Sequence, residues 1–184
     1  MTTSFNGINL AALTQFANAV GQNPSNAKAK FGVTTHWEGQ TRTVATVKSY
    51  DLLGKTYERE FKIVADEPNE LLGRDTAPNP QELLMAALNA CMSVGYVVTA
   101  AAKGVTVRSL EIETNGELDL RGFLGLDENI NPGYNEVHYT VRIDADGSPE
   151  QMEEIHQTVI RTSPNFSNFS KAIHMVPKLV LVGK

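Results

Sequence analysis

The residue with the clearest chemical potential in this sequence is its single cysteine, Cys91. A cysteine attacks other molecules only as a thiolate, which needs a nearby cation or a comparable stabilising environment. Arg42, Arg74 and His36 are the candidate cations, although each could equally be a solvated surface group. A lone cysteine on a helix is also typical of a core position, where it behaves as a small hydrophobe. Residue type alone leaves both interpretations open.

Other reactive arrangements are weaker or missing. Cysteine nucleophiles often act with histidine, but no sequence feature brings any of the four histidines to Cys91. No glycine-rich phosphate loop, HExxH motif or paired-carboxylate pattern is present. A single cysteine excludes an intramolecular disulfide and a cysteine-based zinc site. Residues 144–147 look slightly like a calcium loop but lack its final glutamate, so we expect a turn, no metal and no cofactor. The histidines are His36, His138, His156 and His174.

The cysteine lies in the longest apolar stretch of the sequence, residues 79–104. Asn79 is a favourable N-cap, Pro80 suits the first helical position, and Glu82 stands at the capping-box spacing. Gly104 is a typical helix stop. Apolar side chains occur almost all round between these signals, which is typical of a buried helix. The pattern predicts a helix about 35 Å long that other elements must wrap.

Composition excludes several classes of protein. Polar residues interrupt the apolar stretch, so we expect a core helix and no membrane partner. The first residues lack the basic flank and cleavage site of a signal peptide, and one cysteine is compatible with a reducing compartment, so we expect a cytoplasmic location. A net charge of −5 argues against a nucleic-acid partner. The length of 184 residues and the 41% hydrophobic content fit one domain with a substantial core.

The remaining chain predicts an α+β fold with antiparallel sheets. Residues 1–28 should form an N-terminal helix, at 8–20, and a linker, and residues 29–184 a single domain. We expect the central helix to cover the apolar face of the first three strands. Loops are expected at 67–80 and 121–134, a helix at 148–161 and about one helical turn within 162–172. Patterns of β-branched and aromatic residues predict strands at 31–37, 42–50, 56–66, 105–119, 136–146 and 174–184.

Four stretches, in this order, resemble the OsmC/Ohr family, the osmotically induced and organic-hydroperoxide-resistance proteins. The resemblance extends over about residues 30–183. The matching stretches are HWEGQTRTVATV (36–47), DEPNELLGRDTAPNPQELLMAALNAC (66–91), GVTVRSLEIETNGELDLRGFLGLD (104–127) and RTSPNFSNFSKAI (161–173).

The resemblance implies a fold, an assembly and an activity. The fold would be an intertwined homodimer, with two long central helices between antiparallel sheets built from both chains and with sites at the interface. Family peroxidases attack a small hydroperoxide with a cysteine that matches Cys91, and this cysteine becomes a sulfenic acid. Arg42 matches the arginine that holds the thiolate, and a glutamate at the start of the helix completes the site. The implied protein is a peroxiredoxin-like oxidoreductase of stress responses.

Two positions depart from the family pattern. Gln81 follows Asn79-Pro80 where the family has its glutamate, and Glu82 lies one residue later, about 100° further round the helix. Ser163 occupies the position of the second, resolving cysteine, so turnover would need an external thiol reductant. The predicted site is therefore Cys91, Arg42 and Glu82, with Gln81 and Ser163 against the substrate. The alternatives are a non-catalytic dimer that binds a small ligand in the interface pocket, and a purely structural cysteine.

Overall fold

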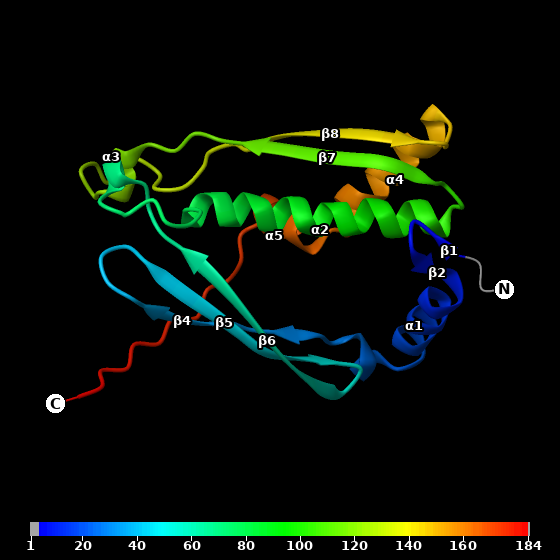
Figure 1. The fold of residues 1–184 in the computed structure, drawn as a ribbon, viewed down its shortest axis with the longest axis horizontal. Helices are drawn as coiled ribbons and strands as arrows, with labels where there is room; N and C mark the ends of the chain where they lie inside the picture. The colour runs from blue at the N-terminus through cyan, green and yellow to red at the C-terminus, as the bar shows by residue number, and fades with distance from the viewer. Residues whose placement is uncertain (1–3, 184) are drawn as a thin grey trace.

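The computed structural model describes residues 4–183, and these form an α+β fold with antiparallel sheets. Figure 1 shows the long helix α2 (Pro80–Ala102) with one sheet above it and a second, larger sheet below it. Residues 1–3 of the expected N-terminal segment and residue 184 of the expected last strand lie outside the described residues. The division into residues 1–28 and 29–184 stays a prediction.

The N-terminal segment forms a small hairpin and a helix. β1 (Ser4–Phe5) pairs with β2 (Ile8–Asn9), and Asn6 at their turn adopts φ 53°. The helix α1 (Leu10–Gln22) confirms the predicted helix, and Asn9 caps it by accepting a hydrogen bond from the Ala12 backbone. The short 3₁₀ helix η1 (Pro24–Ala27) follows. The hairpin was not predicted, because two-residue strands leave no alternating pattern.

A four-stranded antiparallel sheet comes next. β5 (Thr43–Leu52) is paired with β3 (Lys30–Phe31), β4 (Thr34–Trp37) and β6 (Lys55–Ala65). The structure therefore divides the strand predicted at 31–37 into two short strands. The pairing of β5 with β6 is irregular between Val47 and Ser49, close to where the first strand is interrupted.

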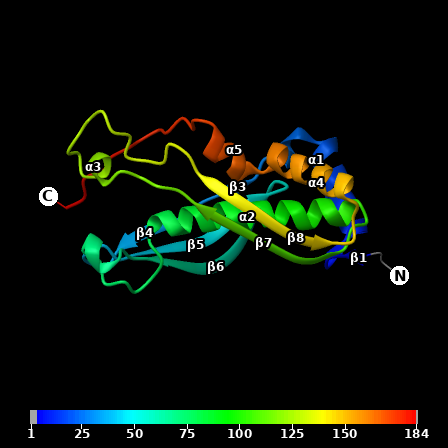
Figure 2. The ribbon, with the colours of Figure 1, turned by 90° about the horizontal axis from the view of Figure 1, so that it is seen from above.

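Helix α2 has the ends that its sequence predicts. Asn79 and Glu82 exchange hydrogen bonds with each other's backbone N–H groups, which is a complete capping box. Gly104 adopts φ 69°, a left-handed conformation that favours glycine. The helix lies against β7 (Val107–Asn115) and its antiparallel partner β8 (His138–Ala145), and against α4 (Pro149–Thr162) and α5 (Pro164–Ser170). Figure 2 shows this second layer from above.

The core of the chain lies between α2 and this second layer. One stripe of α2 is buried against Ile155 and Val159 of α4, and the β7–β8 sheet packs apolar side chains around it. The buried stripe of the helix is Leu88, Met92, Tyr96 and Ala100, which recur at the four-residue spacing of one helix face.

Two expectations about α2 are wrong for a single chain. The helix was expected to be buried all round, yet Leu84 is 43% and Val94 64% exposed. It was also expected to cover the four-stranded sheet, but its extensive contacts are with α4, α5, β7 and β1. The physical reason is that the sheet lies on the far side of α2 without packing on it, so both elements keep exposed apolar side chains.

The predicted strand at 174–184 is also wrong in the described residues, where 174–183 form no strand. A strand requires a neighbour for its backbone N–H and C=O groups, and no strand within residues 4–183 pairs with the segment. Its apolar side chains remain exposed, with Leu179 at 85% and Val182 at 89%.

The connecting segments contain two short helices where loops were expected and a third that confirms an expected helical turn but is longer. The 3₁₀ helix η2 (Asn69–Leu71) lies in the loop before α2. The single turn α3 (Leu120–Phe123) is capped by Asp119, and β7 ends at Asn115 rather than at 119. α5 has seven residues, which is longer than the one turn expected there.

By length and composition α2 could cross a membrane, with a mean hydropathy of 1.7 over its apolar window. The core helix of a soluble protein passes the same test. The absence of a membrane partner therefore stays a prediction.

Candidate active site

The thiol of Cys91 lies beside the hydroxyl of Ser163. The helix α2 presents Cys91 half-buried, and its Sγ is 3.4 Å from Ser163 Oγ. Ser163 is 5% exposed and joins α4 to α5, where its Oγ accepts a hydrogen bond from the Phe166 backbone N–H at 3.2 Å. Either group can donate in this contact, but a thiolate carries no proton, so toward the charged sulfur the Ser163 O–H is the donor. Such a donor favours a negatively charged sulfur over a neutral one.

Helix α5 is anchored so that Ser163 stays over the thiol. Asn165 Nδ2 donates a hydrogen bond of 2.8 Å to the carbonyl oxygen of Ala87, one helical turn before Cys91. On the other side, Asn89 Nδ2 donates to the Ile112 carbonyl oxygen of β7 at 3.0 Å. Hydrogen bonds therefore join the segment of α2 that carries the thiol to α5 on one side and to β7 on the other.

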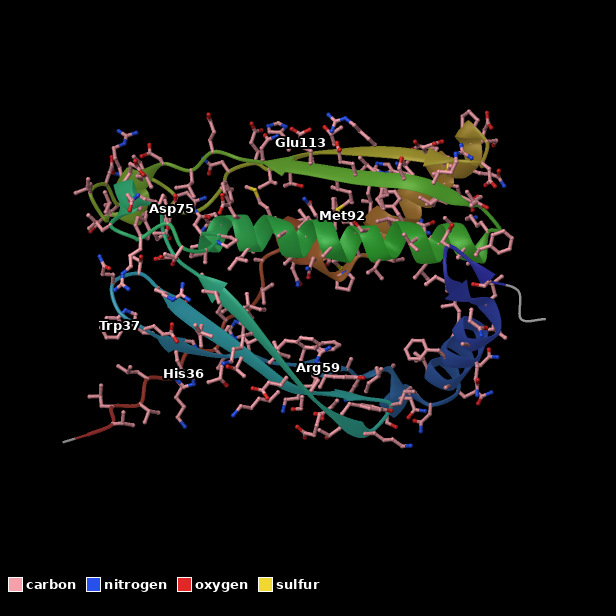
Figure 3. The ribbon with its side chains drawn as sticks, viewed as in Figure 1. His36, Trp37, Arg59, Asp75, Met92 and Glu113 are labelled. Carbon is pink, nitrogen blue, oxygen red and sulfur yellow. The ribbon has the colours of Figure 1, made fainter. Side chains whose placement is uncertain are left out.

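Within the described residues, no arginine, lysine or histidine forms a hydrogen bond with Cys91. Arg42 lies at the start of β5, and Arg74 donates from Nε to Gln40 in the adjoining turn. Figure 3 shows His36 on the four-stranded sheet, in a different layer from Met92, the residue after the cysteine. Among the hydrogen bonds of residues 4–183, the side-chain partner of the thiol is therefore a hydroxyl and not a cation.

The other histidines have partners or positions of their own. His156 Nδ1 is hydrogen-bonded to the Tyr96 hydroxyl, and the two rings stack with centroids 6.0 Å apart. Burial raises the pKa of Tyr96 to about 12. His138 Nε2 is 3.0 Å from Glu136 Oε1, and His174 lies in the C-terminal segment that forms no strand.

Arg42 belongs to a separate network at the beginning of α2. Its Nη1 donates a hydrogen bond of 2.8 Å to Thr76 Oγ1, and its Nε is 3.2 Å from Glu38 Oε2. Thr76 Oγ1 in turn donates to Asp66 Oδ2 at 2.7 Å. The hydrogen bonds from Thr76 and Thr41 hold the pKa of Asp66 well below its usual range.

The predicted carboxylate, Glu82, is used by the helix itself. Its Oε2 accepts a hydrogen bond of 2.8 Å from the Asn79 backbone N–H. Nine residues separate it from Cys91, which is about 13 Å along the helix axis, so one chain does not bring the two together. Gln81 is exposed at the same helix end. Catalytic or substrate-contacting roles for Glu82 and Gln81 stay predictions.

Sequence reasoning missed two carboxylates before α2. Asp66 is 1% exposed, and Glu67 has a buried Oε2 without a hydrogen-bond partner. Burial and then the charge of Asp66 raise the pKa of Glu67. The sequence feature that could have revealed them is the acidic pair directly before Pro68. It was missed because carboxylates in a loop rich in proline, glycine and asparagine are usually exposed to solvent.

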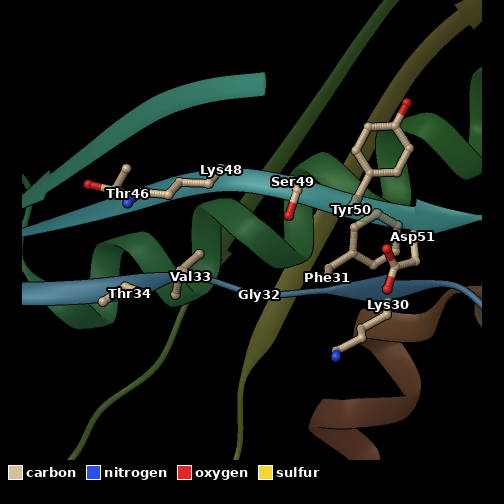
Figure 4. A pocket seen from close by; sticks show the side chains of 10 residues that line it. All are labelled: Lys30, Phe31, Gly32, Val33, Thr34, Thr46, Lys48, Ser49, Tyr50 and Asp51. Atoms are coloured by element: carbon tan, nitrogen blue, oxygen red, sulfur yellow. The ribbon is translucent and has the colours of Figure 1, made fainter. Parts of the chain in front are cut away.

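Two hollows in the described part of the chain lie away from Cys91. Figure 4 shows one on the four-stranded sheet where β3 ends, lined by residues that include Lys30, Lys48 and Tyr50. A larger groove of about 730 Å³ lies between β8 and α4, beside Tyr96 and His156. Within residues 4–183, no three His, Cys, Asp or Glu side chains gather to form a metal site.

Comparison with known proteins gives the family. The family model described as OsmC-like protein matches residues 73–177, which is more than half of the chain. The chain therefore belongs to the OsmC-like family. No match was found among curated proteins.

Solved structures share the fold at low sequence identity. The OsmC-like protein of Mycoplasma pneumoniae has a TM-score of 0.61 and 18% identity, over 77% of this chain and 87% of that one. A Psychrobacter arcticus protein, described as an osmotic stress induced and detoxification response protein, has a TM-score of 0.58 and 18% identity over the same shares. An OsmC-like protein of unknown function from Vibrio cholerae has a TM-score of 0.53 and 15% identity, over 75% of this chain and 92% of that one.

Proposed function

We propose that this chain is a thiol-dependent redox protein that reduces organic or inorganic hydroperoxides with Cys91 as the nucleophile. The observation that carries the proposal is the contact between Cys91 Sγ and Ser163 Oγ at 3.4 Å. A half-buried thiol with a hydroxyl donor beside it differs from a cysteine enclosed only by leucine and valine. Membership of the OsmC-like family supports the same chemistry.

The reaction would proceed by nucleophilic attack on the O–O bond. The Cys91 thiolate attacks one peroxide oxygen, and an S–O bond forms as the O–O bond breaks. The departing oxygen takes up a proton and leaves as an alcohol or water. Cys91 is thereby oxidised by two electrons to a sulfenic acid. The Ser163 hydroxyl can donate to the sulfur before the reaction and to the sulfenic oxygen after it.

Regeneration would require an external thiol, because serine cannot form a disulfide. A reductant thiol attacks the Cys91 sulfenic acid, water leaves, and a mixed disulfide forms. A second thiol attacks this disulfide, which restores the Cys91 thiol and releases the oxidised reductant. The cytoplasm maintains such thiols in reduced form, so we propose that location.

We also propose that the working form is a homodimer in which the four-stranded sheet of one copy packs on α2 of the other. The support is the exposed apolar surface on both elements of a single chain, including Val94 on α2 at 64% and Phe61 on β6 at 59%. The C-terminal segment, with Leu179 at 85%, would also be covered by the second copy. Burial of such surface is the main driving force for association.

This assembly would complete the site with a cation. Within one chain Arg42 is hydrogen-bonded to Thr76 and Glu38 and not to Cys91, so the proposal is that a second copy brings its hairpin against the thiol. An arginine within about 4–6 Å favours the thiolate form of a cysteine. The proposed roles are therefore Cys91 as nucleophile, Arg42 as its cation across the interface, and Ser163 as hydroxyl donor.

The test is direct. The reduced protein is mixed with cumene hydroperoxide or hydrogen peroxide, trapped with dimedone and analysed by mass spectrometry. We expect dimedone labelling at Cys91 that is much faster than for a small free thiol such as cysteine. The Cys91→Ser variant should consume no peroxide. Labelling no faster than that of the free thiol would contradict the proposal.

The alternative of a small ligand bound in the interface pocket stays a prediction, but one observation favours ligand binding at a different place, within the single chain. The groove between β8 and α4 is lined by apolar side chains, including Val141 and Met152, and by polar groups, including His156. Such mixed concave sites commonly bind small molecules. If binding is the function, Cys91→Ser will retain ligand affinity while the native protein shows no enhanced oxidation.

A further inference from the structure

A buried carboxylate lies behind Arg42 and is held by neutral groups alone. Asp66 is 1% exposed. Its Oδ1 accepts hydrogen bonds from Thr41 Oγ1 at 2.8 Å and the Glu67 backbone N–H at 3.0 Å. Its Oδ2 accepts from Thr76 Oγ1 at 2.7 Å and the Thr76 backbone N–H at 3.3 Å. Burial of a charge is costly unless it is paired or hydrogen-bonded, and these four donors satisfy both oxygens.

The hydroxyl of Thr76 connects this carboxylate to the guanidinium. A hydroxyl has one hydrogen, and Thr76 donates it to Asp66 Oδ2. Its oxygen lone pairs are then directed to the other side, where Arg42 Nη1 donates to them at 2.8 Å. Thr41, the residue before Arg42, is also bound to Asp66. Asp66 thus restrains Arg42 at two points. It binds the side chain of the preceding residue, Thr41, and it orients the guanidinium through the Thr76 hydroxyl.

The loop that carries Thr76 is closed by its own backbone. Asp66 N donates to Pro78 O at 3.2 Å, and Asp75 N donates to Glu67 O at 3.0 Å. A side chain at Gly73 would place its Cβ 1.7 Å from Glu67 O, so only glycine allows this approach. Thr76 is therefore presented to Arg42 by a loop with little freedom to move.

We infer that Asp66 is a positioning residue that directs the Arg42 guanidinium through Thr76. The inference rests on the proposed role of Arg42 toward the Cys91 thiolate. A charged but freely rotating arginine would spend only part of its time near the sulfur. The hydrogen-bonded network restricts rotation of the Arg42 side chain before the site assembles. The charge is then already oriented when the reaction begins, as preorganised electrostatic stabilisation requires. Asp66 itself touches neither the thiol nor the peroxide.

The experiment compares Thr76→Val, which removes the hydroxyl and keeps the shape, with Thr76→Ser, which keeps the hydroxyl. Two readouts are measured on the full-length protein: the apparent pKa of Cys91 from the pH dependence of iodoacetamide alkylation, and the rate constant with cumene hydroperoxide. We expect Arg42→Gln to raise the thiol pKa by about one unit or more and to slow the peroxide reaction about 100-fold. Thr76→Val should raise the pKa in the same direction and slow the reaction about tenfold, and Thr76→Ser should restore both.

The four-stranded sheet offers a control for the loss of a threonine hydroxyl. Thr56 Oγ1 donates to Asp51 Oδ1 at 2.7 Å, away from Arg42, so Thr56→Val removes a threonine–aspartate bond of the same kind. It should change neither readout. Asp66→Asn is added with circular dichroism to establish that it folds, and it should reproduce Thr76→Val.

The outcomes separate the two ideas. If Arg42→Gln leaves the thiol pKa and rate unchanged, the role of Arg42 is wrong, and the inference is overturned with it. If Arg42→Gln acts but Thr76→Val does not, the inference alone is overturned. Equal loss in Thr76→Val and Thr76→Ser would also overturn it, because the hydroxyl would then be irrelevant. Loss in Thr76→Val with recovery in Thr76→Ser supports it.

Discussion

At the scale of single residues, the side chain beside Cys91 would decide the fate of the proposed sulfenic acid. A sulfenic acid beside a second thiol condenses to a disulfide, whereas beside a hydroxyl it persists until another thiol arrives. Ser163 Oγ is 3.4 Å from the sulfur, and a serine at this position cannot form a disulfide with it. Replacing the oxygen of Ser163 by sulfur would place a second thiol beside Cys91.

The first prediction follows from that distance. In Ser163→Cys, peroxide should convert both thiols into an intramolecular disulfide, because a disulfide needs sulfurs about 2.05 Å apart and small side-chain rotations can close the gap. The measurement is the loss of two free thiols per chain after one equivalent of cumene hydroperoxide, with the intact mass falling by two hydrogens.

The control places the second cysteine further along the same helix. Ser170 lies seven residues after Ser163, about 10 Å along α5, and is exposed. Ser170→Cys should form no intramolecular disulfide. Equal disulfide yields in the two variants would show that the short Cys91–Ser163 distance does not determine disulfide formation.

The second prediction concerns Tyr96, whose pKa is raised from 10.0 to about 12. As the pH rises above 10, Tyr96 loses its proton in the unfolded chain but retains it in the folded one. The unfolded state is therefore favoured, and the free energy of unfolding should fall between pH 10 and 12. Tyr96→Phe has no such proton and should lack this part of the decline.

Urea unfolding at neutral and alkaline pH checks this prediction. At neutral pH, Tyr96→Phe should lose about 1 kcal/mol, the usual net value of one hydrogen bond, here to His156. The difference between the two proteins should shrink as the pH rises above 10. A constant difference across the range would contradict the raised pKa.

At the scale of elements, the first turn of α2 gives the third prediction. Glu82 completes the capping box by accepting a hydrogen bond from Asn79 N at 2.8 Å. Glu82→Ala should cost about 1 kcal/mol of unfolding free energy, and Glu82→Gln should cost much less, because glutamine also closes the box. Chemical denaturation measures both. If Glu82→Gln loses as much stability as Glu82→Ala, the capping hydrogen bond does not explain how Glu82 stabilises the protein.

The elements that were predicted well are those with local signals. α2 was predicted from Asn79, Pro80 and Gly104, which act on neighbouring residues only, and α4 from its own cap in the same way. The last strand, at 174–184, was wrong because a strand is stable only beside another strand. Alternating or apolar residues show that a segment can pair, and they do not show what it pairs with.

The site was predicted in part for the same reason. Cys91 was the candidate nucleophile and the family resemblance pointed to Ser163; the structure places the two side chains in contact, and their roles stay predictions. Asp66 and Thr76 were missed, because they become a network only when the loop folds back on the hairpin of Arg42. Contacts between residues 34 positions apart have no local signature.

At the scale of the whole molecule, the single chain keeps its two layers apart. α2 is packed on one side by β7, α4 and α5, and its other side carries exposed apolar residues. Exposed surface of this kind on a helix and a facing sheet favours association with a second copy. The exposed C-terminal segment adds to that surface.

The fourth prediction tests the assembly at Val94, which is 64% exposed on α2. Native protein should elute with twice the mass of the chain in size-exclusion chromatography with light scattering. Val94→Glu would place a charge in the apolar interface and should shift the protein to the single-chain mass. Thr140→Glu, at an exposed position on β8 away from α2, should remain dimeric. A dimeric Val94→Glu variant would exclude this face as the interface.

The same variant links assembly to chemistry. If Arg42 of one copy acts on Cys91 of the other, a folded Val94→Glu monomer retains the thiol and Ser163 but loses the cation. Its peroxide rate constant should then fall about 100-fold, toward that of Arg42→Gln, while Thr140→Glu reacts like the native protein. Adding Arg42→Gln to the monomer should cause no further loss, because the interaction is already broken. A further loss in the double variant would mean that Arg42 acts on the thiol within its own chain.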